Sequence, residues 1–440
     1  MLQTIRNAWK IEELRGKMIF TLLILLIFRL GNAIPVPYVD TAQLAIHFQA
    51  METTILGLFN VMSGGSFSQA TIFALSIQPY ITASIVMQLL AVAIPALERL
   101  QKEGGEEGKK LISKITRYGT VGLGLVMGFA YFLMLRNFGL LIDDATGFFP
   151  GLIIVLTFTA GSALVMWLGE QITEFGIGNG ISIILFAGIV SRFPIAIFSM
   201  GMGVMAPAGA EHAIPWWLII LVLAGALALV VLIVIIQNSE RKIPVQYAKR
   251  VVGRKQYGGQ STHLPVKLNM SGVMPIIFAQ ALASLPATIA TFANPTQGGF
   301  LYGFANFFNM TGVPYFLIYT LLILFFSYFY AQIQFNPIEI SNNLKKNGGY
   351  VPGFRPGKPT SDYIQKVLGK VTLFGAVYLA IVAGLPMLVG FIPFGIGTAA
   401  QQTGVALGGT SVIIVVGVAL ETVKGLESQM LMRHYKGFLE

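Results

Sequence analysis

The sequence predicts an all-α polytopic membrane protein with ten transmembrane helices, and three observations lead to this fold class. Hydrophobic residues make up 55% of the 440 residues and charged residues only 11%, whereas a soluble globular domain carries about 25% charged residues. Several apolar runs reach the ~20 residues of helix that cross a bilayer. Most Lys and Arg residues are gathered into a few segments between those runs, which is typical of multispanning membrane proteins.

A basic segment, residues 1–17, precedes the first apolar run. Helical spacing places Ile5, Ala8, Trp9 and Leu14 on one side of it. An amphipathic helix of this kind lies on the membrane surface. The segment is too polar for a removable signal peptide and lacks a cleavage-type ending, so none is expected.

Ten apolar runs follow, and each is long enough to form a helical span. Trp216 and Trp217 mark the interfacial edge of the sixth span, and Pro275 and Pro286 interrupt the seventh. The predicted spans are approximately residues 18–35, 75–96, 118–135, 152–168, 181–200, 216–236, 272–292, 314–335, 371–389 and 408–426.

The basic residues orient these spans. Of the 29 Lys and Arg residues, 26 fall within residues 1–17, 98–117, 238–270, 336–370 and 421–440. The positive-inside rule therefore predicts that both termini and the three long loops are cytoplasmic. The short cytoplasmic turn at residues 172–179 has Glu174 and no Lys or Arg, and is an exception.

Ten spans divide into two halves of five, and an odd number of spans per half inverts the second half relative to the first. Inverted repeats place a functional site at the midplane between the halves. No repeat is visible residue by residue, so this symmetry rests on the span count alone. The expected divisions are residues 1–17 as a cytoplasmic segment, 18–200 and 201–426 as the halves, and 427–440 as a cytoplasmic tail.

The stretch from Gly57 to Gln69 cannot itself span a bilayer. Gly64 and Gly65 break its helix, and lipid would leave the freed backbone groups without partners. It therefore needs a place inside the protein, either as a movable stopper over a constriction or as an ordinary re-entrant loop. The segment alone favours the loop. The span that follows carries Pro79 and spaced isoleucines at Ile77, Ile81 and Ile85.

Few residues could carry chemistry within the spans. Arg29 is expected to pair with backbone or headgroups, while snorkelling or pairing explains Glu170 and Glu421 near cytoplasmic ends, for example Glu421 with Lys424. The absence of a charged relay argues against a proton-coupled carrier. The chain has no cysteine and four scattered histidines, and no phosphate loop, zincin pair or serine nucleophile motif is present. We expect no catalytic residue, metal site or cofactor, and therefore no enzyme.

The long basic loops allow two interpretations. Residues 240–267 and 336–370 combine Lys and Arg with Pro, Gly and Tyr. The charges could serve only to set topology near anionic lipids. They could also form a docking surface for an acidic cytoplasmic partner or for ribosomal RNA. The loops are longer than topology requires, which favours docking.

Several long runs resemble the SecY family, the central subunits of bacterial protein-conducting channels. The resemblance covers essentially the whole chain and is highly specific. The runs are GNAIPVP (31–37), MSGGSFSQATIFALSIQPYITASIVMQLL (62–90), QKEGGEEGKK (101–110), MWLGEQITEFGIGNGISIILFAGIV (166–190), VQYAKRVVGRKQYGGQSTHLPVKLNMSGVMPIIFA (245–279) and FNPIEISNNLKKNGGYVPGFRPGKPT (335–360).

The resemblance implies two inverted five-helix halves that close like a clamshell around a central hourglass pore. An apolar ring would line the constriction, and hydrophobic constrictions gate by dewetting. Leu185 stands where isoleucine is often found, a volume-conserving change that keeps the seal. The ring residues implied are Ile77, Ile81, Ile181, Leu185, Ile277 and Ile414.

The resemblance also implies a plug that closes the external funnel. It further implies a lateral gate that opens to lipid, with the second and third spans on one side and the seventh and eighth on the other. Weak hydrogen bonds between helices suit a gate that must reopen, although each polar group could equally bond its own helix. The gate candidates are Thr82, Ser84, Gln88, Gln280 and Ser284. The plug candidates are Gly57, Leu58, Phe59, Asn60, Val61, Met62, Ser63, Gly64, Gly65, Ser66, Phe67, Ser68 and Gln69.

Partners follow from the same resemblance. A SecA motor ATPase or a ribosome would dock on the basic loops and supply the energy. Arg355 ranks first because glycines and prolines hold it on a stiff turn; the other docking candidates are Arg250, Arg254, Lys255, Lys345 and Lys346. SecE-type and SecG-type small membrane subunits, signal peptides, unfolded preproteins and anionic lipids are further expected partners, at the bacterial plasma membrane. The alternative is an inverted-repeat secondary transporter of a small solute, which requires a polar midplane site.

Overall fold

The computed structural model describes residues 2–51, 55–142, 147–205, 216–247, 250–252, 255–257, 261–270, 272–292, 307, 312–390 and 409–436. Most of these residues are helical. The helices are α1 (Leu2–Lys10), α2 (Glu12–Gly31), α3 (Thr41–Met51), α4 (Ile55–Met62), α5 (Gln78–Ala93), α6 (Pro95–Glu103), α7 (Gly105–Asn137), α8 (Phe148–Phe175), α9 (Gly180–Val190), α10 (Phe193–Met205), α11 (Trp216–Asn238), α12 (Met274–Phe292), α14 (Val313–Gln334), α15 (Pro337–Lys346), α16 (Lys358–Gly390) and α18 (Gly409–Lys436).

Every predicted span overlaps at least one of these helices. Within the described residues, 6 helical ranges are long and apolar enough to cross a membrane: Gly105–Asn137, Phe148–Phe175, Ile219–Asn238, Val313–Lys346, Lys358–Leu385 and Gly409–Leu431. Shorter apolar helices cover Gln78–Ala93, Gly180–Ile195 and Met274–Ser284. The chain is therefore a mostly helical membrane protein.

Helix continues into the loops that the sequence marked as soluble. α7 begins at Gly105 and α16 at Lys358, well before their apolar parts, and α6 and α15 are helices within the first and third loops. These helices are longer than the apolar runs because charged turns can extend an apolar helix beyond the lipid.

Five short strands were not anticipated by the all-α prediction. They are β1 (Glu240–Tyr247), β2 (Arg250–Val252), β3 (Lys255–Tyr257), β4 (Ser261–Lys267) and β5 (Gly349–Tyr350). β4, β1 and β5 form an antiparallel sheet in that order, with Ile243 opposite Leu264. Alternating Ile243 and Val245 on β1 are buried against Val266 and Ile364. This period-two pattern is the strand signal that the basic charges obscured.

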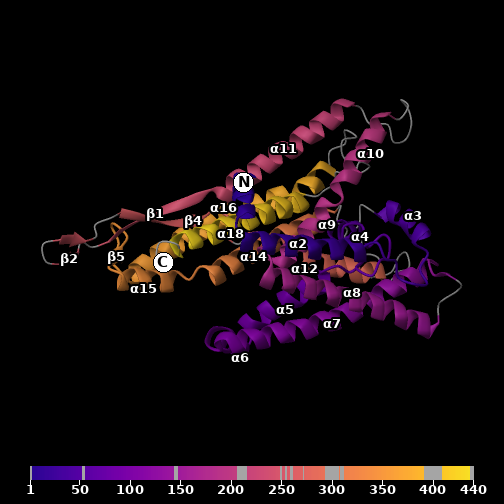
Figure 1. The fold of residues 1–440 in the computed structure, drawn as a ribbon, viewed down its shortest axis with the longest axis horizontal. Coiled ribbons are helices and arrows are strands. Elements are labelled where there is room, and N and C mark those ends of the chain that lie inside the picture. Colours follow the sequence, from indigo (N-terminus) through magenta and orange to yellow (C-terminus); the bar gives the residue numbers. More distant parts are fainter. Residues whose placement is uncertain are drawn as a thin grey trace.

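The strands and α15 lie together at one end of the molecule, and α3, α4 and α10 lie toward the other end (Figure 1). Between them, α7 packs against α5 and α8, while α14 packs against α12 and α16. One large apolar core joins α2, α5, α8, α9, α12, α14, α16 and α18.

The N-terminal helix α1, which was predicted to lie on the membrane surface, also packs against other helices of the chain. Ala8 is fully buried in a small cluster with Leu14 and Leu426. The Thr4 hydroxyl donates a hydrogen bond of 2.9 Å to Glu427 on α18. Trp9 remains exposed, so only one face of the helix is covered by the rest of the chain.

Candidate functional site

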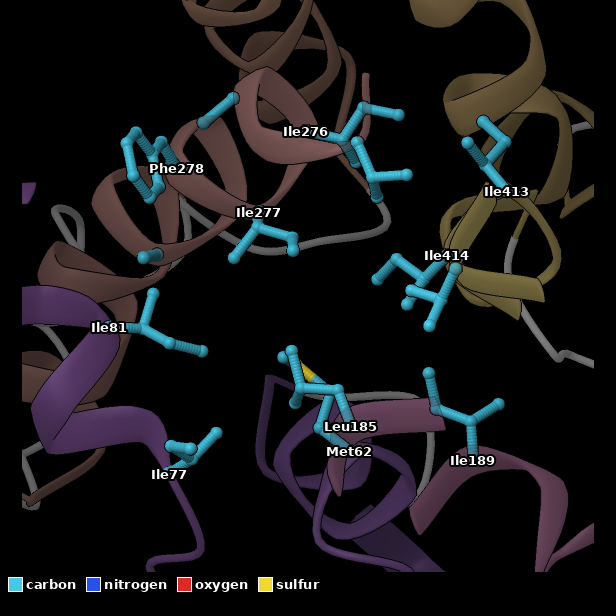
Figure 2. Close-up of a cluster of buried hydrophobic side chains, with 14 of the residues drawn as sticks. Met62, Ile77, Ile81, Leu185, Ile189, Ile276, Ile277, Phe278, Ile413 and Ile414 are labelled. Atoms are coloured by element: carbon cyan, nitrogen blue, oxygen red, sulfur yellow. The ribbon is translucent and has the colours of Figure 1, made fainter. Parts of the chain in front are cut away.

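The predicted ring residues come together from four separate parts of the chain. Ile77, Ile81, Leu185, Ile277 and Ile414 are each no more than 5% exposed and belong to one apolar cluster, and the partly buried Ile181 packs against it. Figure 2 shows the labelled members arranged around a common centre, from the start of α5, from α9, from α12 and from α18. Because Ile77 and Ile81 are four residues apart, as are Ile181 and Leu185, each pair presents one helical face.

A glycine at the start of α9, Gly180, lets α9 approach α8 closely enough to support this cluster. A side chain on Gly180 would meet the Gly169 carbonyl oxygen at 2.0 Å, so no Cβ fits there. The Thr173 hydroxyl accepts a hydrogen bond of 2.9 Å from the Gly180 amide. The first turn of α9 is thereby held against α8, and Ile181 and Leu185 follow directly from it.

Residues 57–69, the predicted plug segment, satisfy several of their polar groups within the segment. Gly64 and Gly65 have φ of 72° and 94°, in the left-handed region that favours glycine. The Asn60 side chain accepts from the Ser68 amide at 2.9 Å, and the Ser63 hydroxyl accepts from the Phe67 amide at 3.1 Å. These internal bonds let a segment rich in Gly, Ser and Asn lie inside a membrane protein.

The plug segment packs directly against the ring. Met62 belongs to the same apolar cluster as the ring residues and lies beside Leu185 (Figure 2). A cavity of ≈ 20 Å³ is lined by both, including Met62, Ile77 and Leu185. That volume holds about one water molecule. The residues of the predicted ring and the segment therefore pack against each other.

A cluster of aromatic rings surrounds Phe67, near the other end of the segment. The Phe67 ring lies 4.5 Å from the Tyr131 ring and 5.4 Å from the Phe48 ring, measured between centroids. The Tyr131 ring lies 4.8 Å from the Phe158 ring. The Tyr131 hydroxyl also donates a hydrogen bond to the Phe67 carbonyl. Side chains from α3 and α7 thus contact Phe67, and Phe158 of α8 packs on Tyr131.

The gate candidates divide into two groups. Thr82 and Ser284 donate to carbonyls of their own helices, at 3.1 Å and 2.8 Å. By contrast, the Gln88 side chain donates to Ser84 at 3.1 Å and accepts from the Tyr330 hydroxyl on α14. Tyr330 was not predicted, because nothing in the sequence pairs residues so far apart. Its hydrogen bond joins α5 to α14.

Gln280 on α12 points to the plug segment. Its amide nitrogen lies 3.8 Å from the Met62 sulfur, and its amide oxygen is buried with no hydrogen-bond partner. An unpaired buried amide oxygen costs free energy. The contact places a polar side chain of the predicted gate directly against the plug segment.

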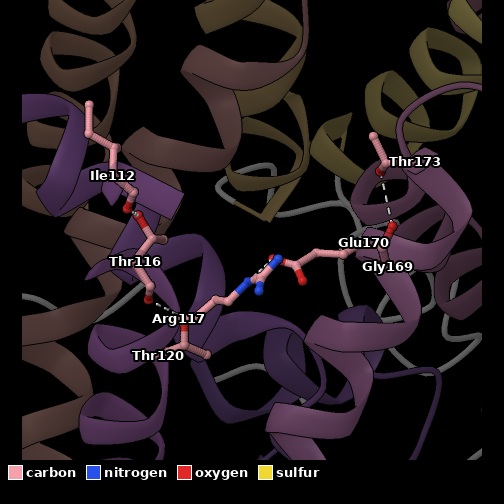
Figure 3. Close-up of polar contacts among 7 residues, drawn as sticks. All are labelled: Ile112, Thr116, Arg117, Thr120, Gly169, Glu170 and Thr173. Atoms are coloured by element: carbon pink, nitrogen blue, oxygen red, sulfur yellow. Dashed lines mark hydrogen bonds and ion pairs between the residues drawn. The ribbon is translucent and has the colours of Figure 1, made fainter. Parts of the chain in front are cut away.

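Two of the three ionisable residues considered in the spans, Glu170 and Arg29, have side-chain partners in the structure. Glu170 forms an ion pair of 2.9 Å with Arg117, which joins α8 to α7 (Figure 3). Pairing, one of the two expected explanations, therefore applies to Glu170. Arg29 was expected to pair with backbone or headgroups, but it donates to the Ser191 hydroxyl at 3.1 Å. Glu421 is exposed on α18.

The docking candidates lie at the end of the molecule that carries the strands. Lys345 and Lys346 occupy the last turn of α15, where the helix dipole favours cations. Arg355 is exposed between Gly353 and Gly357, which have φ of 87° and 101°. Its carbonyl accepts from the Thr360 hydroxyl at 2.8 Å, so the turn is held at its base.

The second basic loop is described only in part. Arg250 begins β2 and Lys255 begins β3. Arg254 lies outside the described residues.

These features define a polytopic helical membrane protein whose helices meet at a buried apolar cluster, with an internal segment packed against it. A model of the SecY family matches residues 71–423. The chain belongs to the SecY family, as its motifs indicated.

Close relatives match along the full length. The chain is 43% identical over 450 residues to the protein translocase subunit SecY of Streptomyces scabiei, with 100% of both chains covered. It is 43% identical over 453 residues to that of Thermotoga maritima, with 100% and 98% covered.

Solved structures show the same fold at lower identity. A protein-conducting channel superposes with a TM-score of 0.64 at 17% identity, covering 94% of this chain and 92% of that one. Sec61 in the canine ribosome–channel complex superposes with a TM-score of 0.58 at 16% identity, with the same coverage.

Proposed function

We infer that this chain is the subunit of a protein translocase through which unfolded polypeptides cross a membrane. It is a protein-conducting channel, and the observation that carries this function is the apolar ring built from α5, α9, α12 and α18. The relatives from S. scabiei and T. maritima are protein translocase subunits. A ring of branched apolar side chains excludes water and ions by dewetting and yields around a passing chain.

The channel has ten spans in two inverted halves, residues 18–200 and 201–426, around an hourglass pore. The overlap of a helix with each predicted span supports this count. Both termini and the strand-bearing end, with the tail from residue 427, face the cytoplasm of a bacterial cell at its plasma membrane. The concentration of basic residues in these segments supports that orientation.

A secondary transporter finds no support in the described residues. Such a protein needs polar or ionic groups between its halves. The buried contact of α5, α9, α12 and α18 is instead an apolar cluster.

Residues 57–69 act as the plug that closes the channel at rest. Their packing against the ring supports this role. The test is ion conductance of the purified protein in planar bilayers, with the intact chain compared with a chain that lacks residues 57–69. We expect a sealed intact protein and a leaky deletion. A deletion that inserts properly and stays sealed would refute the plug and reopen the transporter alternative through solute-uptake assays.

Transmembrane segments leave the channel sideways through a lateral gate. Helices α5 and α7 form one side of this gate, and α12 and α14 form the other. The hydrogen bond from Tyr330 to Gln88 supports α5 and α14 as facing edges of this gate. The gate can reopen because hydrogen bonds between membrane helices contribute only ~0.6–1.7 kcal/mol.

Replacing Tyr330 by phenylalanine is expected to ease gate opening. The variant loses the hydrogen bond to Gln88, so a preprotein with a weakened signal sequence should be translocated about threefold to tenfold faster. Translocation into proteoliposomes measures this. Tyr328→Phe is the control, because the Tyr328 hydroxyl donates to the Gly369 carbonyl of α16, away from α5. Equal rates for the two variants would contradict the assignment.

A motor ATPase of the SecA type or a translating ribosome docks on the cytoplasmic loops and supplies the energy, so the chain itself is not an enzyme. The sheet of β4, β1 and β5 gives these loops a fixed shape, which favours docking over a purely topological role. Sec61 in the canine complex is bound to a ribosome. SecE-type and SecG-type subunits complete the assembly, and anionic lipids contact the basic segments.

Reversing the charge of Arg355 is expected to reduce motor-driven translocation by at least about tenfold, because a docking contact then becomes repulsive. The measurement is SecA-dependent and ATP-dependent translocation of a preprotein. Lys358→Glu makes the same charge change three residues further on, at the start of α16. If Arg355→Glu retains full activity, or loses no more than Lys358→Glu, Arg355 has no special place in docking.

A further inference from the structure

The glycine turn of the plug lies directly on the backbone of α9. A side chain on Gly188 would place its Cβ 2.6 Å from the Met62 carbonyl oxygen. From the other side, a Cβ on Gly64 would lie 3.0 Å from the Gly188 carbonyl oxygen. The two backbones therefore touch, and the absence of a side chain on Gly188 sets how closely the plug approaches α9.

Two polar side chains complete this contact. The Ser191 hydroxyl donates to the Gly188 carbonyl at 2.6 Å and accepts from Arg29 at 3.1 Å. A Cβ on Gly64 would also lie 3.0 Å from the Ser191 hydroxyl and 3.1 Å from the Arg29 guanidinium. The turn thus faces three polar atoms, one each from Gly188, Ser191 and Arg29.

A fourth polar contact lies beside them. The Asn32 amide nitrogen is 3.5 Å from the Ser63 carbonyl oxygen, and the buried amide oxygen of Asn32 has no hydrogen-bond partner. This long, incompletely satisfied contact holds the turn weakly. A weak polar contact suits a segment that must leave its place when a polypeptide enters.

Two residues of this contact are energetically unfavourable at the positions they occupy. Glycine within a helix is less favourable than alanine by roughly 1 kcal/mol. An arginine within a span is also unfavourable. Gly188 lies inside α9 and Arg29 in the last turn of α2, and both meet at the same turn of the plug.

We propose that Gly188, Ser191 and Arg29 form the seat of the plug, a positioning site that fixes its closed depth. This proposal rests on the plug function proposed above. Gly188 permits the backbone contact, and the hydrogen bond between Ser191 and Arg29 closes the side of the seat.

The decisive variant is Gly188→Ala. Its methyl group fits α9 but overlaps the Met62 carbonyl, so the plug must move outward. We expect resting ion conductance in planar bilayers to rise by at least about tenfold, the factor that corresponds to about 1.4 kcal/mol of overpacking. Gly201→Ala is the matched control, because a Cβ on Gly201 of the following helix α10 meets nothing within 4 Å.

A second measurement follows the plug directly. The chain has no cysteine, so Ser66→Cys introduces a single thiol at a position that is 1% exposed. Labelling by a water-soluble maleimide should be slow in this background and faster when Gly188→Ala is added. Arg29→Gln should raise labelling a few-fold, since it removes the charge that faces Ser191, and Ser191→Ala should do the same.

The outcomes separate the seat from the plug function. A leaky plug deletion together with a leaky, rapidly labelled Gly188→Ala supports the seat. A leaky deletion with a sealed Gly188→Ala overturns the seat and leaves the plug intact, as does a leak without faster labelling. A sealed deletion overturns the plug function and the seat with it.

Discussion

Replacing Phe67 by alanine is expected to leave the resting channel permanently leaky to ions. Phe67 is 3% exposed and lies in ring contact with Phe48, Phe59 and Tyr131. Truncation of a buried phenylalanine typically costs about 3–5 kcal/mol. Because these contacts join the plug segment to α3 and α7, their loss weakens the closed position of the plug more than it weakens the rest of the fold.

Conductance of the purified variant in planar bilayers measures this effect. Phe129→Ala is the control on α7, because Phe129 is 53% exposed and packs on little within the chain. Tyr131→Phe should produce a smaller leak, since it removes the hydrogen bond to the Phe67 carbonyl and keeps the ring. A sealed Phe67→Ala protein, with a folded state confirmed by its thermal melt, would show that the aromatic cluster around Phe67 does not hold the plug.

Replacing Gly161 by alanine is expected to prevent stable folding. A Cβ on Gly161 of α8 would lie 1.9 Å from the Ile72 carbonyl oxygen and 2.8 Å from its carbonyl carbon. That backbone cannot move away easily, because the Ile72 amide donates to the Ile34 carbonyl at 3.0 Å and Thr71 pairs with Pro35. A clash between two fixed backbones exceeds the ~1–3 kcal/mol typical of overpacking.

The yield of monodisperse protein in detergent and its thermal unfolding temperature measure the effect. Gly122→Ala is the matched control, since a Cβ on Gly122 of α7 meets nothing within 4 Å. The control should fold normally or gain slightly in stability, because alanine favours helix over glycine by ~1 kcal/mol. Normal yield and melting of Gly161→Ala would mean that α8 can shift away from Ile72.

The residues predicted to form the ring lie in or against one apolar cluster, and the residues that support this cluster were not predicted. Ile77, Ile81, Ile181 and Leu185 have helical spacing and stand in recognisable family motifs. Gly180, which lets α9 approach α8, is one of 49 glycines, and the sequence does not distinguish a glycine at a helix crossing from one that faces lipid. The strands of the second loop were missed because its charges outweighed the short alternation of Ile243 and Val245.

Composition and charge pattern by themselves determined the membrane class, the order of the spans and the expectation that residues 57–69 need a place inside the protein. These follow from local properties, namely hydrophobicity, helix breaking and the position of Lys and Arg. The tertiary structure alone decided which polar groups meet. Arg29 and Ser191, Arg117 and Glu170, and Gln88 and Tyr330 are separated by 162, 53 and 242 positions. Such pairs depend on how helices pack, and helix packing is set by the sum of many apolar contacts that no single motif encodes.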